Sequence, residues 1–446
     1  MKPDCRIIRR EDPGFRQAVT GTLFNKRPLD RWPAMICYPR TVADVRDLVL
    51  YAKSLEKKIS ICSGGHSWSA NHVRDDAVLI DLSNFNEYAI DAAKMTATAG
   101  PAVGGSVLMT ELFKRELFFP AGHCRGVCLG GYLLQGGFAW NGPKLGLACE
   151  SVIGIDVVTA DGEYLHCDER ENADLFWAAR GAGPGFFGVV VRFHLKLYRR
   201  PKYYGMIGQV FRLKHLEEVY RWAYEIGPRV PRAVEFQMLM TPRTLKFLAP
   251  GIEVAAPIFA ESKAELDEAR AFLDESPIRH KAFFRTPFVR MGMKTLYRFA
   301  MSHYPAGHCW NVDNMWTSAP VDELIEFHRE IAAALPPAPS HVLWLNWQPP
   351  VRRTEMSFSV EDRIYISLYA GWKAAADTAR YGSWATDLLK KYAHLGSGIQ
   401  LADENLNNRP ARFLAAENLR KLDEIRQTRD SAGRFHEWHG RPPIED

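Results

Sequence analysis

The stretch Ile61-Cys62-Ser63-Gly64-Gly65-His66-Ser67-Trp68-Ser69 carries the strongest indication of the fold in this sequence. The apolar residues 58–62 predict a strand that runs into a glycine-containing turn. Two adjacent glycines relieve the steric limits on the backbone, so consecutive amides can point together into a nest for phosphate. The segment has neither the spacing of a GxGxxG motif nor the lysine of a P-loop. Taken alone, it also fits a tight turn with a surface histidine.

A second glycine-rich stretch covers residues 119–138, with six glycines between Gly122 and Gly137. Glycines at this density weaken helices and strands and indicate close approach of the backbone to a flat ligand. Apolar residues such as Leu129 and Phe138 make the segment too apolar for a solvated linker. A third stretch, residues 174–190, predicts a buried helix, a glycine turn and a core strand.

In this order and spacing, the three stretches resemble the vanillyl-alcohol-oxidase/PCMH superfamily of flavoproteins, in its berberine-bridge-enzyme-like branch. The resemblance covers residues 34–198. It resumes from about Asn405, where residues 429–435 (RDSAGRF) stand in for the family's closing motif Tyr-Asp-Pro-x-x-x-Phe. The resemblance implies an FAD cofactor and a PCMH-type FAD-binding domain.

The resemblance also implies covalent attachment of the flavin at two points. His66 stands where the family bonds the flavin 8α-methyl group, and Cys124 stands where the bicovalent branch bonds flavin C6. Cys128 replaces a family glycine and is interpreted as a packing substitution, and Tyr132 replaces a common histidine. Val127 stands at the family's oxygen gate, where a short side chain implies an oxidase. The other expected cofactor contacts are Ser63, Gly64, Gly65, Ser67, Gly130, Gly131, Gly136, Gly137 and Val157.

The expected fold class is α+β: the FAD-binding domain plus a substrate domain with an antiparallel sheet covered by helices. Residues 1–200 are expected to form the N-terminal part of the FAD-binding domain, 201–404 the substrate domain, and 405–446 a tail returning to the FAD domain. Strands are predicted at residues 77–82, 152–159, 188–198, 233–240, 252–259, 309–317, 341–348, 354–360 and 363–371. Helices are predicted at residues 42–55, 107–117, 172–180, 262–273, 321–335 and 415–426.

The substrate side is expected on the strands of the middle domain. Along residues 363–372, Tyr365 and Tyr369 share one face, which is the better candidate for the cavity. A tyrosine base there would need a lowered pKa. The position of the catalytic glutamate of plant relatives falls near Gln348, and an amide is no general base. The candidates for catalysis are Tyr365, Tyr369, His303 and Asp313, and those for substrate binding are Gln348, Trp344 and Tyr304.

Composition limits the remaining functions. The chain has 446 residues, 47% hydrophobic and 24% charged, which is typical of a globular protein. A net charge of +5 spread along the chain indicates no nucleic-acid partner. No run of apolar residues is long enough for a transmembrane helix, and residues 1–17 do not resemble a secretory signal, so a cytoplasmic protein without a membrane partner is expected. The eight cysteines show no disulfide framework and no zinc spacing, and no metal is expected.

The sequence therefore predicts an FAD-dependent oxidase that moves hydride from an alcohol carbon of a sugar or an aromatic or phenolic compound to covalent FAD. Oxygen would then reoxidise the flavin and give H2O2. Two alternatives stay open: a flavin dehydrogenase with a non-oxygen acceptor, and a non-redox cyclase built on a flavin scaffold. The expected partners are a small-molecule substrate and O2, and the expected state is a monomer or homodimer.

Overall fold

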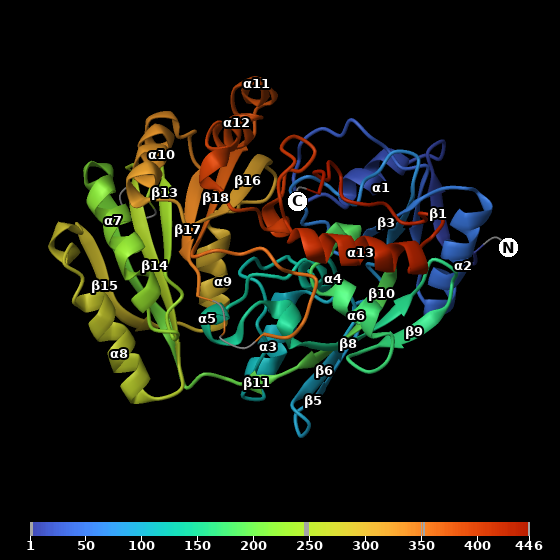
Figure 1. The fold of residues 1–446 in the computed structure, drawn as a ribbon, viewed down its shortest axis with the longest axis horizontal. Helices are drawn as coiled ribbons and strands as arrows, with labels where there is room; N and C mark the ends of the chain where they lie inside the picture. Colours follow the sequence, from blue (N-terminus) through green and yellow to red (C-terminus); the bar gives the residue numbers. More distant parts are fainter. Residues whose placement is uncertain (1–2, 245–248, 349, 351–352, 445–446) are drawn as a thin grey trace.

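The computed structural model describes residues 3–244, 249–348, 350 and 353–444. It consists of an N-terminal lobe with two main sheets and a second lobe built on one large sheet, side by side in Figure 1. The mixed helix and sheet architecture confirms the expected α+β class. None of the described helices is both long and apolar enough to cross a membrane.

The first sheet of the N-terminal lobe positions the Ser-Gly-Gly-His turn. Its strand order is β1 (Arg6–Arg9), β2 (Met35–Tyr38), β4 (Val78–Asp81) and β3 (Ile59–Cys62), with β2, β4 and β3 parallel. Helix α2 (Val42–Ser54) begins at a capping box, because the Thr41 side chain accepts from the Asp44 amide and the Asp44 carboxylate accepts from the Thr41 amide. The turn follows β3 directly.

The second sheet of this lobe has the order β5 (Tyr88–Asp91), β6 (Thr96–Ala99), β10 (Val189–Lys196), β8 (Val152–Val158) and β9 (Tyr164–Cys167). Strands β7 (Leu117–Phe118) and β11 (Tyr198–Arg199) form a separate two-stranded antiparallel sheet. The helices of the lobe are α1 (Phe15–Gly21), α3 (Gly105–Phe113), α4 (Leu129–Leu134), α5 (Gly142–Leu145) and α6 (Ala173–Ala179).

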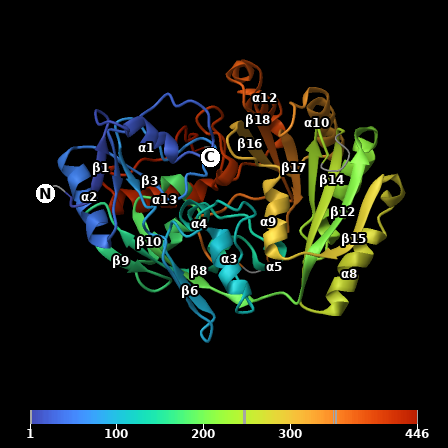
Figure 2. The ribbon, with the colours of Figure 1, turned by 180° about the vertical axis from the view of Figure 1, so that it is seen from behind.

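The second lobe is a seven-stranded antiparallel sheet. Its order is β15 (Phe284–Arg290), β12 (Tyr203–Arg212), β14 (Gly251–Ala260), β13 (Gln237–Thr241), β17 (His341–Asn346), β18 (Ile364–Trp372) and β16 (Cys309–Thr317). Helices α7 (Leu216–Ile226), α8 (Lys263–Asp274) and α10 (Val321–Ala334) cover its outer face (Figure 1). Helix α9 (Met293–Met301) lies on the side of the N-terminal lobe (Figure 2). Helices α11 (Thr378–Tyr381) and α12 (Trp384–Lys391) contact β18.

One predicted strand is wrong. In residues 354–360 the backbone bonds to the C-terminal end of α6 instead of to a sheet: the Ser357 amide donates to the Trp177 carbonyl and the Phe358 amide to the Arg180 carbonyl. These bonds attach the connection between β17 and β18 to the N-terminal lobe. The elements that were not predicted include strands β2, β6, β12 and β15 and helices α4, α7 and α9.

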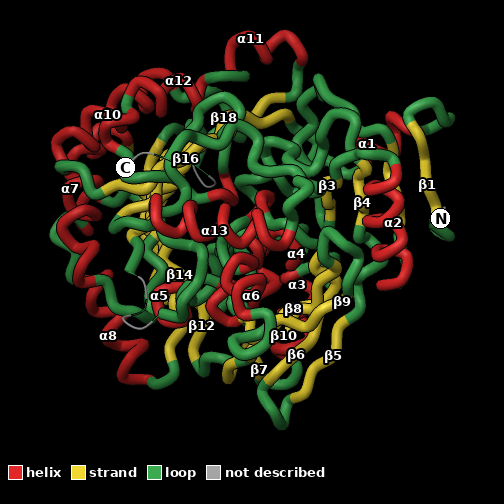
Figure 3. The backbone as a smooth tube through the Cα atoms, turned by 45° about the vertical axis from the view of Figure 1, so that its right-hand side comes forward, coloured by secondary structure: helices red, strands yellow, loops and turns green. Residues whose placement is uncertain are grey.

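The end of the chain returns to the N-terminal lobe. Helix α13 (Ala416–Arg429) crosses that lobe in Figures 1 and 3, and Arg429 forms an ion pair with Asp174 at 2.8 Å. Beyond it, the Ile59 amide donates to the Arg434 carbonyl and the His436 amide to the Ile59 carbonyl. The last segment therefore lies along β3.

A carboxylate and two histidines on the second sheet give a pH-dependent contribution to stability. Asp156 accepts from Nδ1 of His166 at 2.8 Å and from Nε2 of His194 at 3.0 Å. Burial opposes ionisation of Asp156, but the hydrogen bonds from His194 and His166 outweigh it and lower its pKa to about 2. The hydrogen bond to Asp156 raises the pKa of His166.

We expect Asp156→Asn to destabilise the protein more at pH 5.5 than at pH 8.5. The raised pKa of His166 adds stability that is complete below its unfolded pKa and is lost as the pH rises through its folded pKa. Asp156 itself is ionised at both pH values. Because His166 is 40% exposed and solvent screens the pair, the difference should be only about 0.5 kcal/mol. Urea unfolding of both proteins at both pH values measures this difference. An equal loss of unfolding free energy at pH 5.5 and pH 8.5 would contradict the prediction.

Candidate active site

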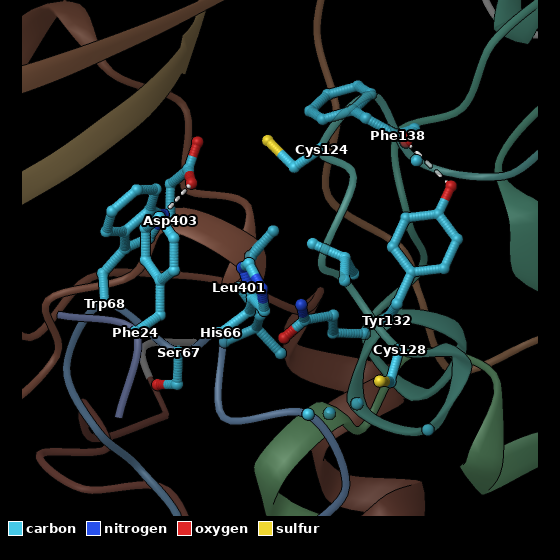
Figure 4. Close-up of a pocket in the computed structure, with 18 of the residues that line it drawn as sticks. Phe24, His66, Ser67, Trp68, Cys124, Cys128, Tyr132, Phe138, Leu401 and Asp403 are labelled. Carbon is cyan, nitrogen blue, oxygen red and sulfur yellow. Dashed lines mark hydrogen bonds between the residues drawn. The ribbon is translucent and has the colours of Figure 1, made fainter. Parts of the chain in front are cut away.

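A cavity lies between the loops of the N-terminal lobe and the inner face of the seven-stranded sheet. The turn at residues 63–67, the segments around Cys124 and Gly130, and the tail at Phe435 line it from the first lobe. Strands β13, β17 and β18 and helix α9 line it from the second. Figure 4 shows part of this lining.

The turn after β3 presents His66 to the cavity. Gly65 has φ +66°, and a side chain there would collide with the Thr22 carbonyl, so the turn requires glycine at this position. The Phe24 ring stacks on the His66 imidazole at 4.5 Å (Figure 4). Burial lowers the pKa of His66 to about 4. The imidazole is therefore neutral at physiological pH and keeps a nucleophilic nitrogen.

The two cysteines of the glycine-rich segment differ in their surroundings. Cys124 borders the cavity, and burial raises its pKa to about 12, so it is a thiol. The Cys128 sulfur packs on the turn, since a Cβ at Gly64 would lie 2.7 Å from it. Figure 4 shows the two sulfur atoms in different parts of the cavity. Cys128 also borders the cavity, so both thiols belong to its lining.

The segment that carries Cys124 is fixed at both ends. His123 pairs with the buried Glu235 at 2.8 Å, and Glu235 also accepts from the Asn141 amide. The Tyr132 hydroxyl reaches the carbonyls of Phe138 at 2.8 Å and Pro120 at 3.1 Å (Figure 4). Tyr132 therefore closes the glycine-rich loop and holds Cys124 and Val127 against the cavity.

The lining has the properties that a bound FAD requires. Gly131 lines the cavity, and a Cβ added there would point into open space. Its neighbour Gly130 is packed against Ser63. The buried guanidinium of Arg74 supplies a positive charge to the same lining, which suits a diphosphate. The donor set thus fits FAD, with a cradle of small residues on one side and His66 on the other.

Sequence reasoning missed Asp403. Its Oδ2 accepts from the hydroxyls of Tyr365 and Tyr369, both at 2.6 Å. Its Oδ1 accepts from the Trp68 indole at 2.7 Å (Figure 4). Gln400 holds the segment in place through its backbone. Its backbone N–H donates to Asn314 Oδ1 at 2.8 Å, and its backbone carbonyl accepts from Asn314 Nδ2.

Burial and the Asp403 carboxylate raise the pKa of Tyr365 and of Tyr369 well above 10. Both tyrosines therefore stay protonated and act as donors. This is opposite to the lowered pKa that a tyrosine base would need.

Several predicted residues do border the cavity. They are Ser63, Gly64, Gly65, His66, Ser67, Cys124, Val127, Gly130, Gly131, His303, Tyr304, Tyr365 and Tyr369.

Other predicted residues lie outside it. Trp344 on β17 packs on Tyr220 of α7, and Gln348, two residues beyond the end of β17, donates to the Gly227 carbonyl at the end of α7. Neither side chain reaches the cavity, contrary to the expected substrate contacts. Asp313 is fully buried in a two-point ion pair with Arg409, at 2.6 and 2.8 Å, so the expected catalytic role does not fit its position.

Three of the expected cofactor contacts likewise lie outside the cavity and pack against other parts of the protein. Gly136 lies under Phe358 and Gly137 under the Tyr132 ring. Val157 is fully buried in β8, where it packs on Gly188. Gly188 and Val190 border the cavity, whereas Val157 does not. The glycine turn before β10 is the sequence feature that points to these two residues.

The fold and the cavity together define an FAD-binding oxidoreductase. A family model described as an FAD binding domain matches residues 33–168. The FAD-linked oxidoreductase janO of Penicillium janthinellum is 32% identical over 443 residues, which cover 95% of this chain and 95% of that protein. Berberine bridge enzyme-like 12 of Arabidopsis thaliana is 32% identical over 246 residues, which cover 52% of this chain and 44% of that protein.

A solved structure of 6-hydroxy-D-nicotine oxidase from Arthrobacter nicotinovorans shares the fold, with a TM-score of 0.83 at 22% identity. The match covers 100% of this chain and 98% of that one. The chain belongs to the berberine-bridge-enzyme-like family of FAD-linked oxidoreductases, which confirms the resemblance seen in its sequence.

Proposed function

We propose that this protein oxidises an alcohol at the Asp403 end of the cavity and uses O2 as the electron acceptor. FAD, when bound, supplies the hydride acceptor for the carbinol C–H and passes two electrons to O2, which gives H2O2. The observation that carries the proposal is the Asp403 carboxylate, which borders the cavity and is bonded to Trp68, two residues after His66.

Asp403 is the proposed acceptor of the substrate hydroxyl proton. An ionised carboxylate offers about four acceptor positions. Three are used by Tyr365, Tyr369 and Trp68, which leaves one position on Oδ1 for a substrate hydroxyl. Loss of this proton to Asp403 makes the alcohol oxygen electron-rich and so favours departure of hydride from the adjacent carbon. Tyr365 and Tyr369 hold the carboxylate in place.

We further propose that His66 and Cys124 both bond to the flavin. Each bond would replace a flavin C–H bond with a C–N or C–S bond, and the two electrons and two protons released per bond would pass to O2 and give H2O2. The neutral imidazole of His66 and the thiol of Cys124 border one cavity, and both come from segments held rigidly by the surrounding packing. Two bonds would fix the isoalloxazine ring relative to Asp403. They would also retain the cofactor in a cavity open enough for a large substrate.

The function is tested by mixing the purified holoenzyme anaerobically with a panel of primary alcohols and then with air. Bleaching of the flavin absorbance by an alcohol, followed by rapid recovery and one H2O2 per alcohol, is the expected result. Bleaching with slow recovery in air and fast recovery with a quinone would show a dehydrogenase instead. No bleaching by any alcohol would contradict alcohol oxidation.

Val127 is expected to control the reaction with oxygen. Its side chain is half-buried and borders the cavity, so a larger side chain would fill space through which O2 approaches. We expect Val127→Phe to slow reoxidation by about tenfold, which corresponds to about 1.4 kcal/mol in the barrier. The anaerobic rate of flavin reduction should stay close to that of the native enzyme. Val127→Ala is the control. An unchanged reoxidation rate in Val127→Phe would contradict the proposed role of Val127 in the reaction with oxygen.

A further inference from the structure

The inner face of the seven-stranded sheet carries a continuous apolar surface. Leu239 on β13 pairs with Leu343 on β17, and Leu345 lies two residues further along the same face. Leu296 and Phe299 of α9 border the cavity beside them. We refer to Leu239, Leu343, Leu345, Leu296 and Phe299 as the leucine wall.

The leucine wall begins next to the proposed catalytic group. Leu345 pairs with Tyr365 in the β17–β18 ladder, and Leu343 pairs with Ser367. A substrate with its hydroxyl at Asp403 would place its body near Leu343 and Leu345, which lie on the strand next to Tyr365 and Tyr369. The wall continues from there toward α9.

Two polar groups beside this wall, Gln237 and His303, are partly engaged or neutral. Gln237 donates to Glu235 at 3.2 Å, and Glu235 also binds His123 and the Asn141 amide. Burial lowers the pKa of His303 to about 4, so it is neutral, and its Nε2 has no hydrogen-bond partner in the described parts of the chain. The wall thus offers a large apolar area, bordered by the polar groups of Gln237, His303, Tyr304, Tyr365 and Tyr369.

We infer that the substrate is an alcohol with a hydrocarbon body and that it is not a carbohydrate. This inference rests on the proposed alcohol oxidation. Hydrocarbon surface gains free energy when it leaves water for the leucine wall. A sugar would place several hydroxyls against leucine side chains, where they lose water and find no partner.

The first test compares three probes on the holoenzyme. Geraniol is a primary alcohol with a hydrocarbon body, linalool is its tertiary isomer without a carbinol hydrogen, and D-glucose is the polyol. We expect geraniol to reduce the flavin at least about 100-fold faster than D-glucose at equal concentration under anaerobic conditions. Linalool should bind, as measured by calorimetry and by a shift of the flavin spectrum, and should leave the flavin oxidised.

The second test changes the wall itself. Leu343 is half-buried, so polar substitution there should be tolerated by the fold. We expect Leu343→Asn to weaken linalool binding and the apparent affinity for geraniol by about tenfold, with little change in the limiting rate of flavin reduction. Leu343→Ala should weaken linalool binding and the apparent affinity for geraniol less than Leu343→Asn does. Leu50→Asn, at a 44% exposed position on α2, is the matched control and should change neither.

The outcomes separate this inference from the proposed function. Reduction of the flavin by D-glucose faster than by geraniol would overturn the hydrocarbon substrate and leave alcohol oxidation standing. Reduction by neither alcohol would overturn alcohol oxidation, and linalool binding lost in Leu343→Asn would still support the apolar site. Linalool that fails to bind, or that binds equally well to Leu343→Asn and Leu50→Asn, would overturn the inference.

Discussion

Asp403→Asn is expected to lower the anaerobic rate of flavin reduction by about 1,000-fold, within the range for loss of a positioned base. The amide keeps the size of the carboxylate and still accepts from Trp68 or a tyrosine, but it takes no proton from the substrate. The loss should appear in the limiting rate at saturating alcohol. Linalool affinity should change far less, because the leucine wall is intact.

The control for this variant is Asp387→Asn, at an exposed aspartate on α12. It should reduce the flavin at the native rate. Tyr365→Phe and Tyr369→Phe each remove one donor to Asp403 and should slow reduction less than Asp403→Asn does. A native limiting rate in Asp403→Asn would show that the proton goes elsewhere.

His66→Ala is expected to remove the flavin from one of two tryptic peptides. Trypsin places His66 in residues 59–74, Cys124 in residues 116–125 and Cys128 in residues 126–144. In the native protein, acid precipitation should give a yellow pellet, and mass spectrometry should find peptides 59–74 and 116–125 joined through the flavin. In His66→Ala, the flavin should stay on peptide 116–125 alone.

The double variant His66→Ala, Cys124→Ala should release all of its FAD into the acid supernatant. Cys128→Ala is the control and should give the native pattern, because its sulfur packs on Gly64. Flavin mass on peptide 126–144 would assign the second bond to Cys128. A colourless pellet from the native protein would contradict covalent attachment.

The sequence predicted those parts of the fold and site that depend on local chemistry. The turn at residues 63–67 is contained in one short motif, and the capping box at Thr41 sets the start of α2. Both are formed by neighbours in the chain. The bounds predicted for β16, residues 309–317, also match those of the structure.

The parts that were missed depend on contacts between distant residues. Alternation in β17 predicts that Trp344 and Gln348 share a face, but it does not tell which face meets the cavity, and α7 covers theirs. Asp403 lies 34 residues after Tyr369 and 335 after Trp68, so no local pattern links the three. Burial of β18 raises the pKa of its tyrosines, which the identity of the residues alone does not reveal.

The position of the tail beside β3 has a consequence for biosynthesis. Phe435 and His436 complete the cavity next to Ile59, yet they are synthesised more than 370 residues later. During translation the first lobe emerges from the ribosome with this side of the cavity open. We therefore expect stable capture of FAD, and the covalent attachment proposed above, only after the tail has left the ribosome.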